Sequence, residues 1–559
     1  MTDAVKNCHL VVLSHGLWGT CDHFKYIEQN LKTTLKLKYP NKKFAFFKTK
    51  SNEKFKTYDG IDLCGSRVAQ EILHEVEKLS NIGFNIDEFS LVGYSLGGLI
   101  ARFAIGVLYY KGFFQHRRAV NFITFCSPHV GVLTPGNSIS VKLFNNLIPW
   151  LLGKSGKQMF LKDNVYKKNI NDKENIPLLV LMATPSSVFY QGLLKFENKA
   201  LYSNIRSDIR TSWWTSGISY INPFEILDKN PNVNIDEHGI MHFQNGSTFE
   251  LKFVNGYEPV ILEVNKAIKF TGLIDYEEER RLSKNMPNNI LTKQRPDLEA
   301  EEYIQNLFFR KLKWLILLLH SLIYFPMWIS WFILHNSFQV FTSTYRVIQE
   351  SPILTDTNIY DIVGQLNHSD FQNSTQSYLI SSSSSSPLVR PTITRMLSEG
   401  YTNELTKLEN GVHDQGDTFL QSVFDAVTSS KEVNESIFDQ KSLYVEKGDK
   451  NLVTSINKLC SVCVDDIKDW EIDFKKLAPT IEEAFEYYQI LKPFKLGMST
   501  QQRMIIKNLN NFKWQKFPLY ISKTNSTHAA AIVRHDDPKF EEGKIVVHHF
   551  CNEVFVVQI

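Results

Sequence analysis

At 559 residues, the chain is long enough for a large core in two or three domains, or in one domain with insertions. The formal net charge of +3 is too small to predict a nucleic-acid partner. Seven cysteines are an odd and sparse set, which indicates a reducing compartment rather than a disulfide framework. The N-terminus has no basic leader before its short apolar run, so we expect no cleaved secretory signal.

The first half of the chain alternates strand-like and helix-like segments. Short β-rich or apolar runs at residues 8–19, 43–50, 89–93 and 119–131 predict strands, and residues 66–80 and 97–110 have the apolar spacing of helices. Several of the strands are apolar throughout, as expected for a parallel sheet that is covered on both faces. The sequence therefore predicts an α/β fold with a mostly parallel central sheet.

The remaining residues divide the chain further. We assign 1–230 to the main core, 231–310 to an irregular, β-rich insert, 311–341 to a hydrophobic segment, 342–478 to a largely disordered insert that is rich in Ser, Asn, Asp and Thr, and 479–559 to the C-terminal part of the core.

Cys460 and Cys463 form a C-x-x-C without a second pair or an H-x₃-H at zinc-finger distance, so we predict free thiols there and no metal site.

A G-x-S-x-G pattern lies between a predicted strand and a predicted helix. Gly93 and Gly97 flank Ser95 at two residues on either side, and small residues there let strand and helix approach each other behind a strained, exposed serine. The alternative is a structural turn serine. The strand before the motif and the helix after it favour a nucleophile.

A serine nucleophile also needs donors for the developing oxyanion. His15, Gly16 and Leu17 follow the first strong strand, where the backbone N–H of Leu17 could meet that of Leu96. Each such donor lowers the barrier by roughly 3 kcal/mol in known enzymes. We interpret His15 as a turn histidine and assign it no proton transfer.

Five segments together resemble a known family. They are VVLSHGLWG, LVGYSLGGLIAR, FCSPHVG, ALYSNIRSDIRTSWWTS and THAAAIVRH followed by EEGKIVVHHF. This ordered set is similar to the fungal branch of the serine-esterase lipases in the α/β-hydrolase superfamily, which includes yeast lipid-droplet phospholipases and monoacylglycerol lipases. The resemblance covers about residues 8–225 and 480–559. It implies hydrolysis of glycerolipid acyl esters through a Ser-Asp-His triad, without a metal or organic cofactor.

Carried over to this chain, the resemblance implies Ser95 as nucleophile, Asp208 as acid and His528 as base, in the chain order expected for the fold. The family's acid is usually followed by Arg-Thr-Val-Pro, whereas Ile-Arg-Thr-Ser follows Asp208. Alternative acids are Asp163 and Asp172, which do not follow a strand-like run.

The alternative base is His129, which we expect to shape the pocket instead. We expect His535, His548 and His549 to be surface or strand histidines.

Residues 314–334 contain no Asp, Glu, Lys or Arg. Twenty-one residues would be about 30 Å long as a straight helix, and Pro326 divides them into two arms. A buried core helix is the alternative to a membrane segment. Because the predicted acid precedes this segment and the predicted base follows it, we expect a hairpin that enters and leaves a membrane or lipid droplet by one face.

The sequence thus predicts a lipase or phospholipase on a lipid droplet or the endoplasmic reticulum membrane, with the catalytic domain facing the cytosol. A glycerolipid or phospholipid would be its substrate. An acyltransferase with the same triad and a catalytically silent lipid-surface scaffold remain alternatives. Head group, acyl-chain preference and oligomeric state are left open by the sequence.

Overall fold

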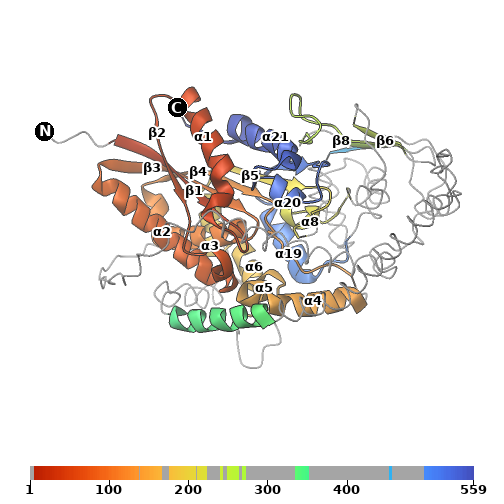
Figure 1. The fold of residues 1–559 in the computed structure, drawn as a ribbon, viewed down its shortest axis with the longest axis horizontal. Coiled ribbons are helices and arrows are strands. Elements are labelled where there is room, and N and C mark those ends of the chain that lie inside the picture. Colours follow the sequence, from red (N-terminus) through yellow and green to blue (C-terminus); the bar gives the residue numbers. More distant parts are fainter. Residues whose placement is uncertain are drawn as a thin grey trace, which may run out of the picture.

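A six-stranded parallel sheet forms the centre of the protein (Figure 1). The computed structural model describes residues 6–136, 139–165, 176–208, 210–222, 224, 239–242, 248–263, 267–271, 334–351, 452–455 and 496–558. The strand order is β10-β5-β4-β3-β1-β2. The strands are β1 (Lys6–Ser14), β2 (Lys43–Lys48), β3 (Phe84–Tyr94), β4 (Arg118–Phe125), β5 (Asn198–Asn204) and β10 (Gln515–Leu519).

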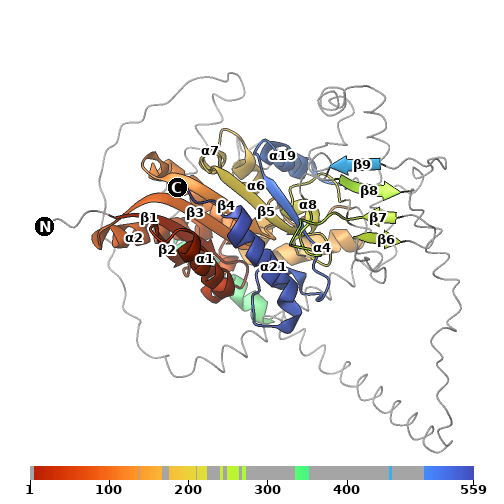
Figure 2. The ribbon, with the colours of Figure 1, turned by 90° about the horizontal axis from the view of Figure 1, so that it is seen from above.

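Helices cover both faces of this sheet, and each face has its own buried apolar cluster (Figures 1 and 2). One face carries α1 (Lys25–Lys38), α20 (Thr527–Ala530) and α21 (Glu541–His549). The other face carries α2 (Ile61–Asn81), α3 (Leu96–Tyr110), α4 (Ile139–Leu151), α5 (Gly153–Met159), α6 (Leu178–Ala183), α7 (Val188–Leu194), α8 (Trp213–Ser216) and α19 (Thr500–Leu509).

The predicted fold class is confirmed. The inner strands β3 and β4 are almost wholly buried, which explains why their sequences are apolar runs without the polar alternation of a one-sided sheet. All strand pairs of the sheet are parallel, and β10, from the C-terminal part of the chain, pairs with β5. The carboxyl ends of all six strands therefore point to the same edge, where the sequence places its candidate site residues.

A second, four-stranded antiparallel sheet consists of β6 (Ile240–His242), β7 (Thr248–Glu250), β8 (Ala267–Thr271) and β9 (Leu452–Ser455). Its first three strands lie within residues 231–310, for which the sequence predicts a β-rich insert. Among the elements that were not predicted are β9 and a helix over residues 334–349, which crosses the predicted boundary at 341.

The hydrophobic segment itself, up to residue 333, lies outside the described residues, as do Asp172, Cys460 and Cys463. Among the helices that are described, none is both long enough and apolar enough to cross a membrane. The hairpin and the remaining domain boundaries stay predictions.

One buried carboxylate attaches the helix 334–349 to the core. Asp59 is fully buried between the 3₁₀ helix η2 (Lys54–Tyr58) and α2, and its two oxygens accept from Arg67 and Arg346, each at 2.8 Å. The neighbouring Tyr58 hydroxyl donates to Asn336 Oδ1 at 2.8 Å. A buried charge is stable only when it is paired, so Asp59 fixes the position of a helix almost 300 residues later in the chain.

This pairing predicts a large stability effect. Asp59→Ala removes the fully buried partner of Arg67 and the partner of Arg346, and leaves Arg67 with only the more exposed Glu350 at 2.8 Å. It should lower the free energy of unfolding by about 3 kcal/mol, as measured by urea denaturation. Lys544→Ala breaks an exposed pair with Glu541 and serves as the control, with little or no change expected because water screens such a pair. Equal effects of the two substitutions would contradict a structural role for Asp59.

Candidate active site

Ser95 lies at the turn between β3 and α3, in the strained backbone conformation that a nucleophile elbow requires. Its φ of 55° and ψ of −130° are rare for a residue with a side chain. A Cβ on Gly97 would lie 2.1 Å from the Ser14 carbonyl oxygen, and one on Gly93 would lie 2.6 Å from Gly98 Cα. Both glycines are therefore needed for strand and helix to approach this closely, as the sequence pattern predicts.

The two predicted oxyanion donors lie beside Ser95. Leu96 is the first residue of α3, and Leu17 belongs to the loop after β1. A Cβ on Gly16 would lie 2.7 Å from Ser95 Cβ, so this loop touches the serine directly. Within the described part of the chain, neither amide N–H of Leu17 or Leu96 has a hydrogen-bond acceptor. Both amides are thus available to a bound oxygen, as an oxyanion site requires.

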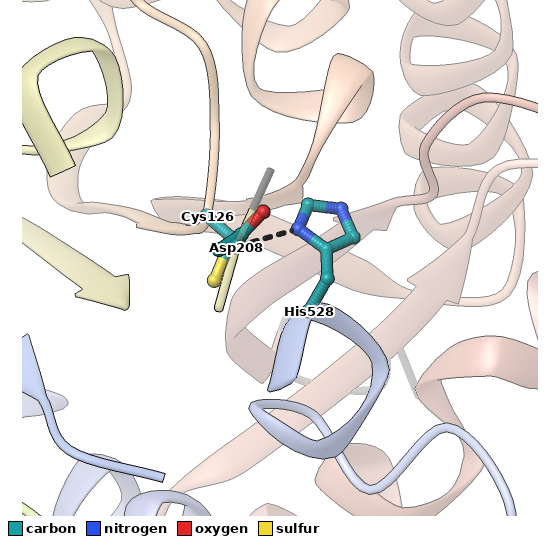
Figure 3. A group of neighbouring side chains, drawn as sticks. All are labelled: Cys126, Asp208 and His528. Atoms are coloured by element: carbon teal, nitrogen blue, oxygen red, sulfur yellow. Dashed lines mark hydrogen bonds and ion pairs between the residues drawn. The ribbon is translucent and has the colours of Figure 1, made fainter. Parts of the chain in front are cut away.

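Asp208 and His528 form a buried pair across 320 residues of sequence (Figure 3). His528 Nδ1 lies 2.9 Å from Asp208 Oδ2. Since a carboxylate only accepts hydrogen bonds, Nδ1 carries the proton. The other ring nitrogen, Nε2, is then the one that can take a proton from a nucleophile.

Tyr94 connects this pair to the elbow. It directly precedes Ser95, its hydroxyl donates to the His528 carbonyl at 3.1 Å, and its ring centre lies 5.0 Å from that of His528. The short helix α20, which carries His528, is thereby held against the end of β3. Ser95, Asp208 and His528 line the same cavity together with Leu17 and Leu96.

The carboxylate of Asp208 is held by three more hydrogen bonds. The Thr211 backbone N–H donates to Oδ1 at 3.0 Å, the Thr211 hydroxyl to Oδ2 at 3.1 Å, and Asn204 Nδ2 to Oδ2 at 3.0 Å. Burial alone would raise the pKa of Asp208, but the charge of His528 and these hydrogen bonds lower it below its usual value. Asp208 is therefore a fixed anion that can orient and stabilise an imidazolium.

Sequence reasoning missed both of these supporting residues. Thr211 follows the acid at a spacing of three, which is a local turn signal that could have been recognised, and it belongs to the segment in which the chain departs from the family pattern. Asn204 is the last residue of β5 and has no such signal, because strand ends carry many asparagines for other reasons.

Cys126 completes a compact group with the pair (Figure 3). The ligand atoms of Cys126, Asp208 and His528 lie within 4.8 Å of one another. A metal would need the thiolate, yet burial and the Asp208 charge raise the pKa of this thiol well above its ordinary value. In addition, Asn204 Nδ2 points to Sγ at 3.4 Å and binds Asp208 as well. The group fits a supported Asp–His pair better than a metal centre.

The alternative site residues lie elsewhere. His129 is fully buried, and its Nε2 lies 2.9 Å from Thr124 Oγ1. Burial, together with the charges of Arg102 and Lys516, lowers its pKa well below the ordinary value, so it stays neutral and packed in the core. Asp163 accepts from the Leu178 backbone N–H at 2.9 Å and is not among the residues that line the cavity.

The remaining histidines partly correct the expectation from sequence. His548 and His549 both lie on α21; His548 is exposed, as expected, whereas His549 is buried, so the expectation is wrong for His549. The Tyr202 hydroxyl lies 2.8 Å from His549 Nδ1, and burial lowers the pKa of His549 to about 4. His15 is also buried, with Nδ1 3.1 Å from the Gly16 carbonyl, in agreement with its interpretation as a turn histidine.

The cavity around Ser95 has a volume of about 320 Å³ and two chemically different sides. One side is apolar and comes mainly from α4, α5 and the Trp18 loop. The other side carries polar and charged residues, mostly from the loops after β5 and β10, among them Arg210, Arg534 and Lys539. A cavity of this size with one apolar and one polar side suits a small part of an amphiphile around its ester.

Comparison with known proteins agrees with this geometry. Residues 4–218 match the family described as "Putative serine esterase (DUF676)". The resemblance inferred from the sequence is confirmed. The matched residues contain the elbow and Asp208, whereas His528 lies beyond them.

Two yeast proteins are similar to part of the chain. "Putative lipase ROG1" of Saccharomyces cerevisiae is 29% identical over 232 residues, which are 41% of this chain and 31% of that protein. "Putative lipase C4A8.10" of Schizosaccharomyces pombe is 29% identical over 219 residues, 38% of this chain and 26% of that protein. The aligned part of the chain thus spans only about a third or less of the length of these relatives.

Solved structures match over smaller shares. "Phospholipase PlaB from Legionella pneumophila in complex with thio-NAD" is 16% identical, with a TM-score of 0.18, over 22% of this chain and 26% of that one. An extracellular α/β-hydrolase from a Paenibacillus species is 14% identical, with a TM-score of 0.16, over 25% of this chain and 50% of that one.

The pKa values of Asp208 and Asp163 are shifted in opposite directions, because only Asp208 has a histidine partner. Burial raises the pKa of Asp163 to about 6. Its usual value is about 3.9, so the unfolded chain loses this proton first and the folded state becomes less stable as pH rises from about 4 to 6. In urea denaturation, Asp163→Asn should therefore stabilise the protein by about 3 kcal/mol at pH 8 and by close to nothing at pH 4. A gain that does not depend on pH would contradict the raised pKa.

Proposed function

We propose that this protein is a serine hydrolase that cleaves acyl esters of glycerolipids at a membrane or lipid-droplet surface. The observation that carries the proposal is the buried 2.9 Å pair of Asp208 and His528, which lines one cavity together with the elbow serine. The two amides of Leu17 and Leu96 and the amphiphilic lining of the cavity support the same reaction class. The similarity to yeast lipases supports a lipid substrate.

In the proposed reaction, Ser95 Oγ attacks the ester carbonyl while His528 Nε2 takes the hydroxyl proton. The carbonyl oxygen becomes an oxyanion, and the amides of Leu17 and Leu96 stabilise it. The C–O bond to the glycerol oxygen then breaks, and His528 returns the proton to that oxygen. Asp208 keeps the imidazole in the required tautomer and stabilises its charged form.

Water completes the cycle. It attacks the acyl group on Ser95, gives one proton to His528 and releases the fatty acid, after which Ser95 regains its proton. A lipid alcohol in place of water would make the same machinery an acyltransferase. We take water as the acceptor because the lining that includes His528 also contains many polar and charged residues, and identification of the released products from a glycerolipid panel distinguishes the two outcomes.

The nucleophile is tested by Ser95→Ala. This variant should lose labelling by a fluorophosphonate probe and at least about 10³-fold in kcat on a soluble short-chain ester, because alanine has no attacking oxygen. Ser51→Ala removes a hydroxyl that binds Glu71 outside the cavity, and it should keep both properties. Undiminished labelling of folded Ser95→Ala would exclude Ser95.

The base is tested by a pair of histidine variants. His528→Ala should lose about as much activity as Ser95→Ala, since the members of a triad act as one unit. His129→Ala should cost less activity, although it loses the contact with Thr124, because His129 lies in the core apart from the Asp208 pair. Steady-state kinetics with circular dichroism as a folding check measures both. The reverse order of effects would contradict the assignment.

A further inference from the structure

Two helices expose continuous apolar stripes on their outer faces. In the helix 334–349, side chains at spacings of four and three residues are between 57% and 73% exposed, namely Leu334, Phe338, Phe341, Tyr345 and Ile348. In α4, the exposed fractions lie between 47% and 76% for Ile139, Leu143, Leu147 and Trp150. These are nine of the fifteen exposed large apolar residues in the described part of the chain. Such a concentration marks an interaction surface.

Both helices lie along the same edge of the molecule. They are neighbours on the lower side in Figure 1, and they also lie close together in Figure 2. Two ion pairs attach them to the core there. Asp59 binds Arg346 of the helix 334–349, whereas three residues later Asp62 binds Lys154, at the start of α5 directly after α4, at 2.6 Å. Because both anchors belong to the same short segment of η2 and α2, the two exposed stripes form one surface, which we call the apolar edge.

The composition of the apolar edge fits the surface of a phospholipid layer. Neither helix contains an aspartate or glutamate, and Glu350, directly after the helix 334–349, is paired with Arg67. Aromatic residues such as Trp150 and Tyr345 suit the boundary between head groups and acyl chains. The helix 334–349 also continues directly from the uncharged sequence 314–334.

The cavity reaches the same edge. Phe144 and Ile148 of α4 line the cavity, while Leu143 and Leu147 of the same helix belong to the apolar edge. A lipid surface against this edge would therefore lie one helix away from the apolar side of the cavity that holds Ser95.

We propose that the apolar edge, formed by α4 and the helix 334–349, docks the protein on a phospholipid surface. This inference rests on the proposed function for the identity of its partner. It goes beyond the predicted hairpin because it assigns the contact to described residues on two separate segments of the folded core.

The test measures binding of the full-length protein to phosphatidylcholine vesicles by flotation, with Ser95→Ala as the background so that binding is recorded without hydrolysis. Phe338→Asp/Phe341→Asp and Leu143→Asp/Leu147→Asp should each weaken partitioning at least about tenfold. Each substitution replaces a large apolar side chain, which would be buried in the lipid, with a charged one. The matched control, Leu37→Asp/Ile82→Asp, changes two equally exposed apolar residues on α1 and at the end of α2 and should leave partitioning unchanged.

With Ser95 restored, both edge variants should keep the turnover of a soluble short-chain ester and lose that of lipid in vesicles. Unchanged vesicle binding by both edge variants would overturn the proposal, as would equal loss in the control. A change from dimer to monomer in sedimentation, with vesicle binding retained, would identify a second copy as the occupant and also overturn it. If Ser95→Ala remained active, the proposed function would fail, while the flotation result would still decide the docking surface.

Discussion

The contact between Asp208 and His528 is the constraint on which the arrangement of the chain depends. It joins the end of β5 to the loop after β10, and those two strands are neighbours in the sheet. The 310 or so residues between the two strands must therefore leave the sheet and return beside their point of departure. The entropy of closing a loop grows slowly, by about 0.6 kcal/mol for each doubling of its length, so an insertion of this size is compatible with a precise site.

The same constraint limits how the inserted chain can meet a membrane. At residue 262 the chain is still attached to the core, because the Leu262 N–H donates to the Pro518 carbonyl at 3.0 Å. By residue 336 it is attached again, through Tyr58 and Asn336. A single crossing of a bilayer between these points would place one folded body on both sides. Any insertion of the apolar sequence 314–334 has to be one-sided, which supports the hairpin that the sequence predicts.

Sequence reasoning reached the sheet and the elbow because their causes are local. Buried parallel strands must be apolar, and a strained serine between strand and helix needs glycines at fixed positions, so both leave a pattern in consecutive residues. His528 was assigned through the resemblance, and the chain order and the strand-like FPLYIS before it favoured it over His129. Burial and partners separate the two in the structure, and neither is visible in one sequence.

Other features depend on pairs of distant residues and leave no pattern. The attachment of Arg346 to Asp59 spans 287 positions, and either residue alone looks like an ordinary surface charge. For this reason the boundary at 341 was placed within a helix. Likewise, the proximity of Cys126 to Asp208 follows from β4 and β5 being neighbours in the sheet and not from any motif.

One face of α4 belongs to the apolar edge and another lines the cavity, so the position of this helix bears on how a substrate would reach Ser95. If the protein docks and acts as we propose, an ester in a phospholipid layer has to move its acyl carbonyl to Ser95, and each methylene that is exposed to water on the way costs about 0.8 kcal/mol. Exposure of only four methylenes would cost about 3 kcal/mol, or a factor of about 10² in rate. With Leu143 and Leu147 in the lipid and Phe144 and Ile148 in the cavity, the chain could pass around one helix without crossing water. A preference for lipids in a layer over dissolved esters would then arise from the position of α4, while the chemistry at Ser95 stays the same for both.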